Sequence, residues 1–369
     1  MRNLLSQFSP ESFTVITRAM RGFETVQLDP RLDVRELAGA ALWLPGRFYK
    51  ALGVVRFPVM MARAKSLARR LKPTVIVGVF PDKEALAMTI DAAEASQTPW
   101  IAYLHDTVSE NYAGTQHAAW ADTLQRRTFE EAASVFVTGQ GMRELYLRDY
   151  GFTSKALEIS YVEPIPTELP DDHTDRQAFL GGTIYGVNRH SVCRAAQAFR
   201  EADCRLVLAT SQSWKALETY GLTEELADRE FFRERPEYLS ALKRQGILAV
   251  TLDWPDESEF SPTELATAFP TRAVEYLASG RPVLVHCPEH YFLARFFNQH
   301  QCGLVVSDRS VDALGEAARS LLAGGEEVSR MRQAALRVAR DVFSIDRLAR
   351  VFRDEVNAVA KLKWSQRLG

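Results

Sequence analysis

One stretch of the chain combines the residue types that bind an anion and a pair of hydroxyl groups. It runs from residue 269 to 285 and reads FPTRAVEYLASGRPVLV. Pro270 is typical of the first turn of a helix, Gly280 of the residue that ends it, and Pro282 of the start of a buried strand. Where strands and helices alternate, each helix starts at the carboxyl edge of the sheet, where backbone amides and the helix dipole favour a phosphate. The stretch therefore predicts a phosphate site.

Two side chains of this predicted helix suit a nucleotide. Arg272, at its start, supplies a guanidinium fork for phosphate oxygens. Glu275 lies three residues further on, where its carboxylate accepts hydrogens from two ribose hydroxyls. The alternative interpretation is that Arg272 and Glu275 form an i,i+3 ion pair on the surface. Spacing alone leaves both interpretations open.

Two polar residues follow a buried strand in the first half of the chain. The apolar run from Trp100 predicts that strand, and His105 and Asp106 come at its carboxyl end. Parallel α/β sheets expose polar groups to a ligand at this edge. A histidine that ends a strand is also often a structural residue whose hydrogen bonds are satisfied.

A second turn from strand to helix is suited to a diphosphate. Asn188 and Arg189 follow the predicted strand 179–184 and precede a helix with an apolar face. The alternative is a solvated arginine at a helix start. Gly139 and Gly141 follow another strand, where they allow a ligand to approach the backbone or provide a turn with positive φ.

The order of the predicted elements brings these residues to the carboxyl edges of sheets. Short β-rich apolar runs alternate with helical periodicity, the pattern of parallel strands covered by helices on both faces. Strands are predicted in the first half at 13–17, 25–28, 74–80, 100–105, 134–138 and 157–161, and in the second half at 179–184, 205–209, 247–252, 282–286 and 303–306.

A proline-rich, acidic stretch divides the chain. We expect an N-terminal Rossmann-like domain over residues 1–166, a linker over 167–177 and a second Rossmann-like domain over 178–344. Residues 345–369 are predicted to form a helix that packs back across both domains. Two doubly wound α/β domains that face each other across a cleft are the expected architecture.

The first domain opens without the buried strand with which such a domain normally begins. Residues 3–8 have the pattern of a helix tail that leads into a strand. A strand, a loop and most of a helix amount to roughly 20 to 25 residues. We therefore expect the first domain to lack its first strand, because of a misplaced translation start or a truncated gene.

Composition indicates an ordinary globular protein of two domains. The chain has 369 residues, 46% hydrophobic and 25% charged, which excludes disordered, collagen-like and disulfide-scaffold classes. A net charge of -2 gives no general attraction to nucleic acid. The four cysteines lie in apolar segments without a short-spaced framework, which is typical of small buried residues in a reducing compartment. The N-terminus has no leader pattern, and the chain has no run of about 18 apolar residues, so a cytoplasmic location is expected.

A basic segment contrasts with this neutral background. Between residues 37 and 81 the chain has eight lysines and arginines, all within 47–72, and no acidic residue. Apolar side chains interleave with the charges, as in a segment that lies on an anionic bilayer or meets a lipid-linked acceptor. The alternative is a helix packed on its domain with a solvated basic face. The residues concerned are Arg47, Lys50, Arg56, Arg63, Lys65, Arg69, Arg70 and Lys72, with Trp43, Leu44, Phe48, Tyr49, Phe57, Met60 and Met61.

These motifs together resemble those of the retaining GT-B glycosyltransferases of the family 4 type. The stretch 269–285 is similar to the pattern Phe-Pro-Thr-Lys, Glu-Tyr-Leu-Ala, Gly-Arg-Pro of one subset, with Arg272 in place of the lysine. Gly181 and Gly182 match the opening of the family's second domain, and the runs 302–306, 312–314 and 343–344 match its ending. The resemblance covers roughly residues 70 to 355.

The resemblance implies roles for the candidate residues. Glu275 would hold the ribose of a nucleoside-diphosphate sugar, and Arg272 its diphosphate, with Arg189 as the family's basic residue near the other turn. Phe269, Thr271 and Gly182 belong to the same donor-binding pattern, and Thr267 stands where many members have a second glutamate. His105 would hydrogen bond the transferred sugar near its anomeric carbon, and Asp106 would orient the imidazole.

The implied reaction moves a sugar from a nucleoside-diphosphate donor to an acceptor hydroxyl, with retention of the anomeric configuration. No Asp-x-Asp or His-x-His metal pattern is evident, so we expect arginines and helix amides to neutralise the leaving diphosphate, without a metal or cofactor. The expected acceptor is a carbohydrate or a lipid-linked molecule, in cell-surface polysaccharide or glycolipid synthesis, with the protein peripheral at the inner face of the membrane. No nucleic-acid partner is expected.

Two other functions remain open from the sequence. A non-catalytic GT-B scaffold that binds a partner is favoured by the missing first strand and by Thr267. A GT-B sugar-nucleotide epimerase is the second. A nicotinamide-dependent dehydrogenase is less suited, because no G-x-G-x-x-G follows an early strand.

Overall fold

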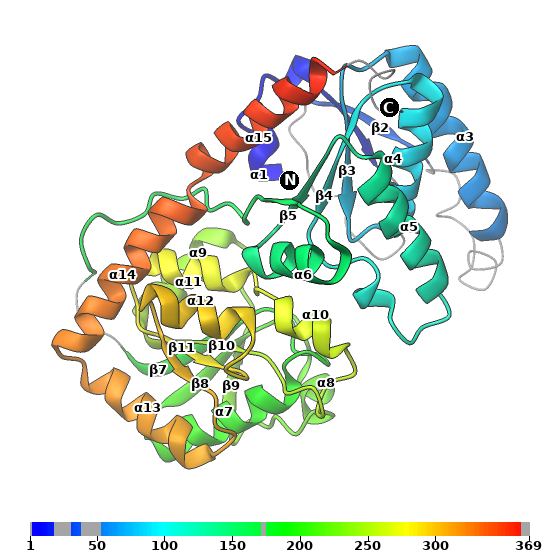
Figure 1. Ribbon diagram of the computed structural model, residues 1–369. Helices are drawn as coiled ribbons and strands as arrows, with labels where there is room; N and C mark the ends of the chain where they lie inside the picture. Colours follow the sequence, from blue (N-terminus) through cyan, green and yellow to red (C-terminus); the bar gives the residue numbers. More distant parts are fainter. Residues whose placement is uncertain (1, 18–30, 38–52, 171–174, 363–369) are drawn as a thin grey trace. The chain divides into compact units, whose positions relative to one another are not determined.

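The computed structural model describes residues 2–17, 31–37, 53–170 and 175–362 (Figure 1). Its contacts divide the chain into two compact units. Unit 1 comprises Met1–Thr138, Tyr146–Leu157 and Leu348–Gly369, and unit 2 comprises Gly139–Leu145 and Glu158–Arg347. The expected boundaries at residues 166, 177 and 344 remain a prediction.

The core of unit 2 is a parallel sheet of six strands in the order β12-β11-β10-β7-β8-β9. The chain starts this sheet in its middle, builds outward to β9, and then returns to the other side of β7 with β10. The point between β7 and β10 is the switch at which doubly wound sheets open a crevice for ligands. The strands are β7 (Asp175–Gly181), β8 (Arg205–Ala209), β9 (Ala227–Glu230), β10 (Gln245–Thr251), β11 (Val283–His286) and β12 (Leu304–Val306).

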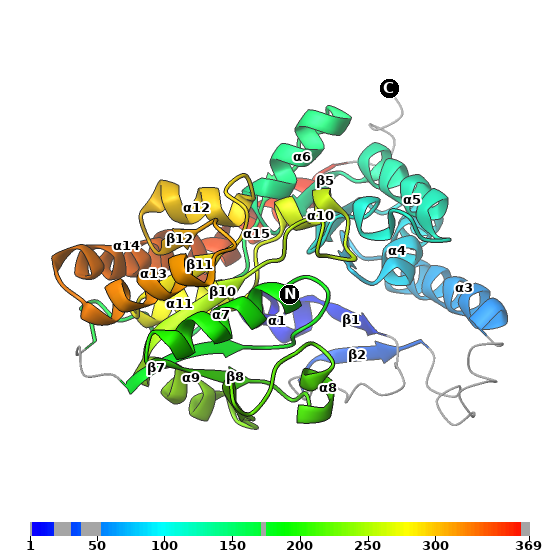
Figure 2. The ribbon, with the colours of Figure 1, turned by 90° about the horizontal axis from the view of Figure 1, so that it is seen from below.

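Alternating side chains of these strands build two cores, one on each face of the sheet. Ala178 and Leu180 of β7 join one core, and Phe179 between them joins the other. The first core, which contains Ala178 and Leu180, includes helices α7 (Arg189–Glu201), α8 (Trp214–Glu218) and α13 (Val311–Ala323). The second core, which contains Phe179, includes α9 (Arg235–Arg244), α11 (Arg272–Ser279), α12 (Phe292–His300) and α14 (Glu326–Phe343). Figure 1 shows α9, α11 and α12 above the strands, and Figure 2 shows α7 and α9 on opposite sides of β7 and β8.

Unit 1 contains a parallel four-stranded sheet in the order β3-β4-β5-β6 and a separate parallel pair, β1-β2. All five residues of β4 are buried, which explains their uniformly apolar character. Helix α4 packs on α3 around Met60, Met88 and Ala92. The strands are β1 (Thr14–Thr17), β2 (Asp33–Glu36), β3 (Ile76–Phe80), β4 (Trp100–Leu104), β5 (Ser134–Val137) and β6 (Lys155–Ala156), and the main helices are α3 (Gly53–Leu71), α4 (Lys83–Ser96) and α5 (Ala118–Glu131).

The remaining helices are short or terminal. Phe352 of the last helix, α15, contacts the rings of Phe8 and Phe136, so this helix packs on unit 1. No described helix has the length and apolarity needed to cross a membrane. These helices are α1 (Arg2–Leu5), η1 (Pro10–Ser12), η3 (Glu110–Tyr112), α6 (Gln140–Tyr150), α10 (Pro262–Thr267) and α15 (Ile345–Ala360).

Most predicted strands are confirmed to within three residues. The strand expected at 157–161 is wrong: β6 is Lys155–Ala156, and Tyr161 forms only an isolated bridge with Ser344. Strands β2 and β9 escaped prediction, because their sequences DVRE and ADRE are charged edge segments. Strand β7 begins at Asp175, inside the stretch expected to be linker. The strand expected at 25–28 lies outside the described residues.

Candidate functional site

Helix α11 carries the motif at 269–285. It begins at Arg272, two residues later than expected from Pro270, because Thr271 is its N-cap residue. Gly280 ends it with φ 68°, as its position in the sequence predicted. The hydroxyl of Tyr276 accepts a hydrogen bond from the backbone N–H of Gly181 at 2.8 Å, and this contact attaches α11 to the carboxyl end of β7.

This attachment brings Arg272 against Gly182. A Cβ atom built on Gly182 would lie 3.7 Å from Cζ of Arg272, an ordinary van der Waals distance, so the guanidinium lies next to this part of the backbone. Gly182 has φ 101°, which side chains rarely adopt. Nη1 of Arg272 is buried and has no hydrogen-bond partner among the described residues. A buried cationic donor without an acceptor fits an anionic ligand at this position.

Glu275 pairs with a residue that the sequence did not single out. Its Oε1 lies 2.7 Å from Nη1 of Arg235, and no ion pair with Arg272 is formed among the described residues, so the i,i+3 alternative is wrong. Arg235 is the first residue of α9 and precedes Pro236, so the arginine-proline pair after β9 was the available signal for a basic helix start.

A small pocket of about 140 Å³ opens beside Gly182 and Tyr238, at the carboxyl ends of β7, β8 and β9. Tyr238, on α9, borders it, and its ring packs against Phe179 and Phe232. Phe231 is 56% exposed, so its ring is available to a ligand. The full lining is Gly182, Thr183, Ala209, Thr210, Ser211, Phe231, Phe232 and Tyr238.

The start of α7 was expected to bind a diphosphate. In the structure, its backbone amides bind the carboxylate of a residue of this chain, Asp253. The backbone N–H groups of His190 and Ser191 donate to the carboxylate of Asp253 at 3.1 and 2.7 Å. Asp253 is completely buried. Arg189 forms an ion pair with Glu259 at 3.1 Å. The role of Arg189 toward a diphosphate stays a prediction.

Three further predicted residues lie near α11 in different surroundings. Phe269 stacks on Phe343 and contacts Phe292 and Phe296, so it anchors the peptide that leads into the helix. Thr271 is exposed at the helix start. Thr267 ends α10, where its hydroxyl donates to carbonyls of that same helix.

In unit 1, His105 lies at the carboxyl end of β4, as predicted. Its backbone N–H donates to Phe80 at 3.1 Å, and its carbonyl accepts from the hydroxyl of Thr138 at 3.0 Å. The imidazole lies against Tyr103, with ring centres 4.4 Å apart, and its Nε2 is buried without a partner among the described residues. Burial lowers the pKa of His105 to about 4, so the ring is neutral near pH 7.

Asp106 follows and, like His105, is half-buried. Burial raises the pKa of its carboxyl group. In the described part of the chain, no hydrogen bond or ion pair joins Asp106 to the imidazole of His105. Orientation of the imidazole by Asp106 therefore stays a prediction.

Gly139 and Gly141 are explained by close packing. Neither has positive φ, so the expected alternative of a positive-φ turn is wrong. A Cβ on Gly141 would lie 2.7 Å from the ring of Phe292, and one on Gly139 would lie 3.4 Å from it. The space beside both glycines is thus filled by an aromatic ring.

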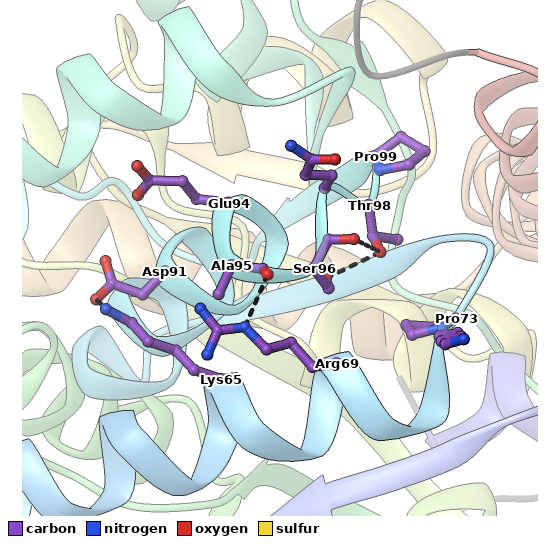
Figure 3. Close-up of a pocket in the computed structure, with 11 residues that line it drawn as sticks. Lys65, Arg69, Pro73, Asp91, Glu94, Ala95, Ser96, Thr98 and Pro99 are labelled. Atoms are coloured by element: carbon purple, nitrogen blue, oxygen red, sulfur yellow. Dashed lines mark hydrogen bonds and ion pairs between the residues drawn. The ribbon is translucent and has the colours of Figure 1, made fainter.

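The basic segment contributes to a larger, open pocket of about 760 Å³ in unit 1. Figure 3 shows Lys65 directed to Asp91 of α4, at 2.8 Å, and Arg69 directed to the carbonyl of Ala95, at 3.1 Å. Met60, Ala64 and Ala68 turn inward to the core. This is the arrangement of a helix packed on its domain, and membrane association stays a prediction. Trp43, Leu44, Arg47, Phe48, Tyr49 and Lys50 lie outside the described residues.

Comparison with known proteins gives a partial family match and a fold. Residues 11–161 match the family described as glycosyl transferase 4-like domain. No curated protein matches the sequence.

Solved structures extend the GT-B comparison over both units. Sucrose-phosphate synthase from Thermosynechococcus elongatus is 15% identical with a TM-score of 0.66 and covers 93% of this chain and 88% of its own. HepE of Anabaena, in complex with UDP-glucose, is 15% identical with a TM-score of 0.65 over 89% and 86%. The α,α-trehalose-phosphate synthase (UDP-forming) of Burkholderia vietnamiensis is 10% identical with a TM-score of 0.62 over 96% of both chains. The predicted GT-B fold is confirmed. The family match over residues 11–161 supports an enzyme of the glycosyltransferase type.

Proposed function

We propose that this enzyme transfers a glycosyl group from a nucleoside-diphosphate sugar to a hydroxyl of a carbohydrate or lipid-linked acceptor, with retention and without a metal ion. The observation that carries the donor assignment is the buried Nη1 of Arg272, which lies beside Gly182 at the carboxyl end of β7 and has no partner among the residues that the structure describes. This is the edge of a doubly wound sheet at which ligands bind.

Each part of the donor has a complementary group in unit 2. The diphosphate lies against Arg272 and the backbone at Gly182, because a guanidinium and a glycine turn suit phosphate oxygens. The ribose hydroxyls donate to the carboxylate of Glu275. The nucleobase enters the pocket between Phe231 and the strand ends at Thr210. The UDP-glucose in the similar HepE structure supports a uridine nucleotide as the first candidate.

Catalysis in this proposal rests on electrostatics and positioning. The bond between the anomeric carbon and the diphosphate breaks, and the acceptor oxygen bonds to that carbon. The proton of the acceptor hydroxyl passes to the leaving diphosphate, whose developing charge Arg272 stabilises. Among the described residues, no group of three or more His, Cys, Asp or Glu is placed to hold a metal ion. The neutral imidazole of His105, with its unpartnered Nε2, is proposed to hydrogen bond the transferred sugar. Asp106 is proposed to support it.

The first test is a thermal-shift screen against UDP, GDP and ADP, because a ligand that binds only the folded state raises the melting temperature. We expect at least one nucleotide to raise it, and Glu275→Ala to reduce that shift. His105→Ala should keep the shift and impair sugar transfer. Stabilisation by none of the three, or a His105→Ala variant with undiminished turnover, would contradict the corresponding assignment. A new nucleotide sugar formed without an acceptor would indicate an epimerase instead.

A further inference from the structure

Three charged side chains of unit 2 meet next to Tyr238, which lines the proposed donor pocket and interacts with Glu275. Arg235 is central: its Nη1 lies 2.7 Å from Oε1 of Glu275, and its Nε lies 3.4 Å from Oε1 of Glu163. The side chain of Glu275 is 20% exposed, whereas those of Arg235 and Glu163 are 46% and 40% exposed. The carboxylate assigned to the ribose is thus the most sheltered member of the cluster.

The three residues of the cluster lie on three different segments of unit 2. Arg235 starts α9, and Tyr238, one turn further along that helix, lines the pocket. Glu163 follows Tyr161, whose backbone N–H donates to Phe343 at 2.8 Å and whose carbonyl accepts from Ile345 at 3.2 Å. Glu275 lies in the first turn of α11. The cluster therefore joins three separate segments beside one ligand site.

The geometry distinguishes Arg235 from Arg272. The guanidinium of Arg272 lies against Gly182, and its buried Nη1 has no partner within the described part of the chain, as expected of a group that binds a phosphate. The guanidinium of Arg235 is already directed to two carboxylates through two of its nitrogens. A hydrogen bond from a guanidinium restricts the rotamers of a carboxylate. A ribose needs such a fixed acceptor for its two hydroxyls.

We propose that Arg235 is a positioning residue for the donor. It holds the carboxylate of Glu275, through Oε1, in the orientation that accepts the 2′- and 3′-hydroxyls of a ribonucleoside diphosphate, and Glu163 holds Arg235 for this role. The proposal rests on the proposed function, since it takes the pocket to be the nucleotide site. It assigns Arg235 to discrimination between ribose and deoxyribose, with no direct contact to the phosphates.

The test measures the dissociation constants of UDP and of 2′,3′-dideoxy-UDP by isothermal titration calorimetry. We expect Arg235→Gln to weaken UDP binding about tenfold, the loss expected for a charged hydrogen-bond partner, and to change dideoxy-UDP binding less than about twofold. Arg235→Lys, which keeps the charge and loses the fork, should lie between wild type and Arg235→Gln. Glu163→Gln should give a smaller, equally ribose-dependent loss. Arg244→Gln, a change at the other end of α9, is the matched control and should change neither constant.

The outcomes separate this inference from the proposed function. Equal losses for UDP and dideoxy-UDP would overturn the inference, because Arg235 would then bind the phosphates or support the fold. An unchanged UDP constant in Arg235→Gln would overturn it as well. If neither UDP, GDP nor ADP binds the wild-type protein, or if Glu275→Gln binds them normally, the proposed function itself fails.

Discussion

One substitution at Arg272 tests the donor assignment. It should weaken the binding of a nucleoside diphosphate, and it should not lower the stability of the protein without ligand. Arg272→Met keeps most of the length and apolar stem of the side chain and removes the guanidinium. In the unliganded protein, Nη1 is buried without a partner among the described residues, so its removal takes away an unfavourable group. With a nucleoside diphosphate bound, the same change removes the expected phosphate contact.

The magnitudes follow from hydrogen bonding. A hydrogen bond to a charged group contributes about 1.5 to 3 kcal/mol, which corresponds to a loss of roughly 10- to 150-fold in affinity for a nucleoside diphosphate. An unpaired buried polar group lowers the free energy of unfolding by about 1 to 3 kcal/mol. Its removal in Arg272→Met therefore offsets the stability lost with the packing contacts of the guanidinium. The melting temperature without ligand should therefore stay the same or rise.

The assay combines titration calorimetry of UDP with thermal melting of the unliganded protein. Arg272→Lys should lose less affinity than Arg272→Met, because it keeps a positive charge without the planar fork. Arg244→Met serves as the control for removing a surface arginine. An unchanged dissociation constant in Arg272→Met, or a melting temperature several degrees lower without ligand, would refute the reasoning, since Arg272 would then be a structural residue.

Three other predictions concern stability. Gly280→Ala should lower the free energy of unfolding by about 1 to 3 kcal/mol in urea titration, because an alanine at φ 68° is strained and its Cβ would lie 2.9 Å from Pro170; an unchanged midpoint would contradict this. Burial lowers the pKa of His105 from 6.5 to about 4. Between these two pH values the unfolded chain binds a proton at this imidazole and the folded chain does not. The free energy of unfolding therefore falls as the pH is lowered from about 6.5 to 4. His105→Asn should remove part of that fall in melting curves at pH 7.5 and 5, and equal losses in both proteins would count against the assigned burial. Asp253→Asn should lower the free energy of unfolding by about 1 to 3 kcal/mol, because an NH₂ group replaces one of the two oxygens that accept from the backbone amides of His190 and Ser191. A melting temperature equal to that of wild type would show that these contacts contribute little.

Local patterns in the sequence were sufficient for the elements that carry the site. Helix α11 and its glycine end, the buried strand β4 and the position of His105 all follow from apolar periodicity and from the conformational preferences of proline and glycine. These signals act over a few residues, so they can be recognised without knowledge of the rest of the fold. Charged edge strands such as β9 lack that signal, and they were not predicted.

Which side chains meet was decided by the tertiary structure. Glu275 pairs with Arg235, 40 residues away, and not with its neighbour on the helix; Arg272 lies against Gly182; and Asp253 caps a helix that starts more than 60 residues earlier. Such partners depend on the order of strands in the sheet, which places β7 between β10 and β8. The sequence by itself determined the two kinds of element and the residues at their ends. The folded sheet determined which of those ends lie side by side, because contacts between distant segments form only when the strands have paired.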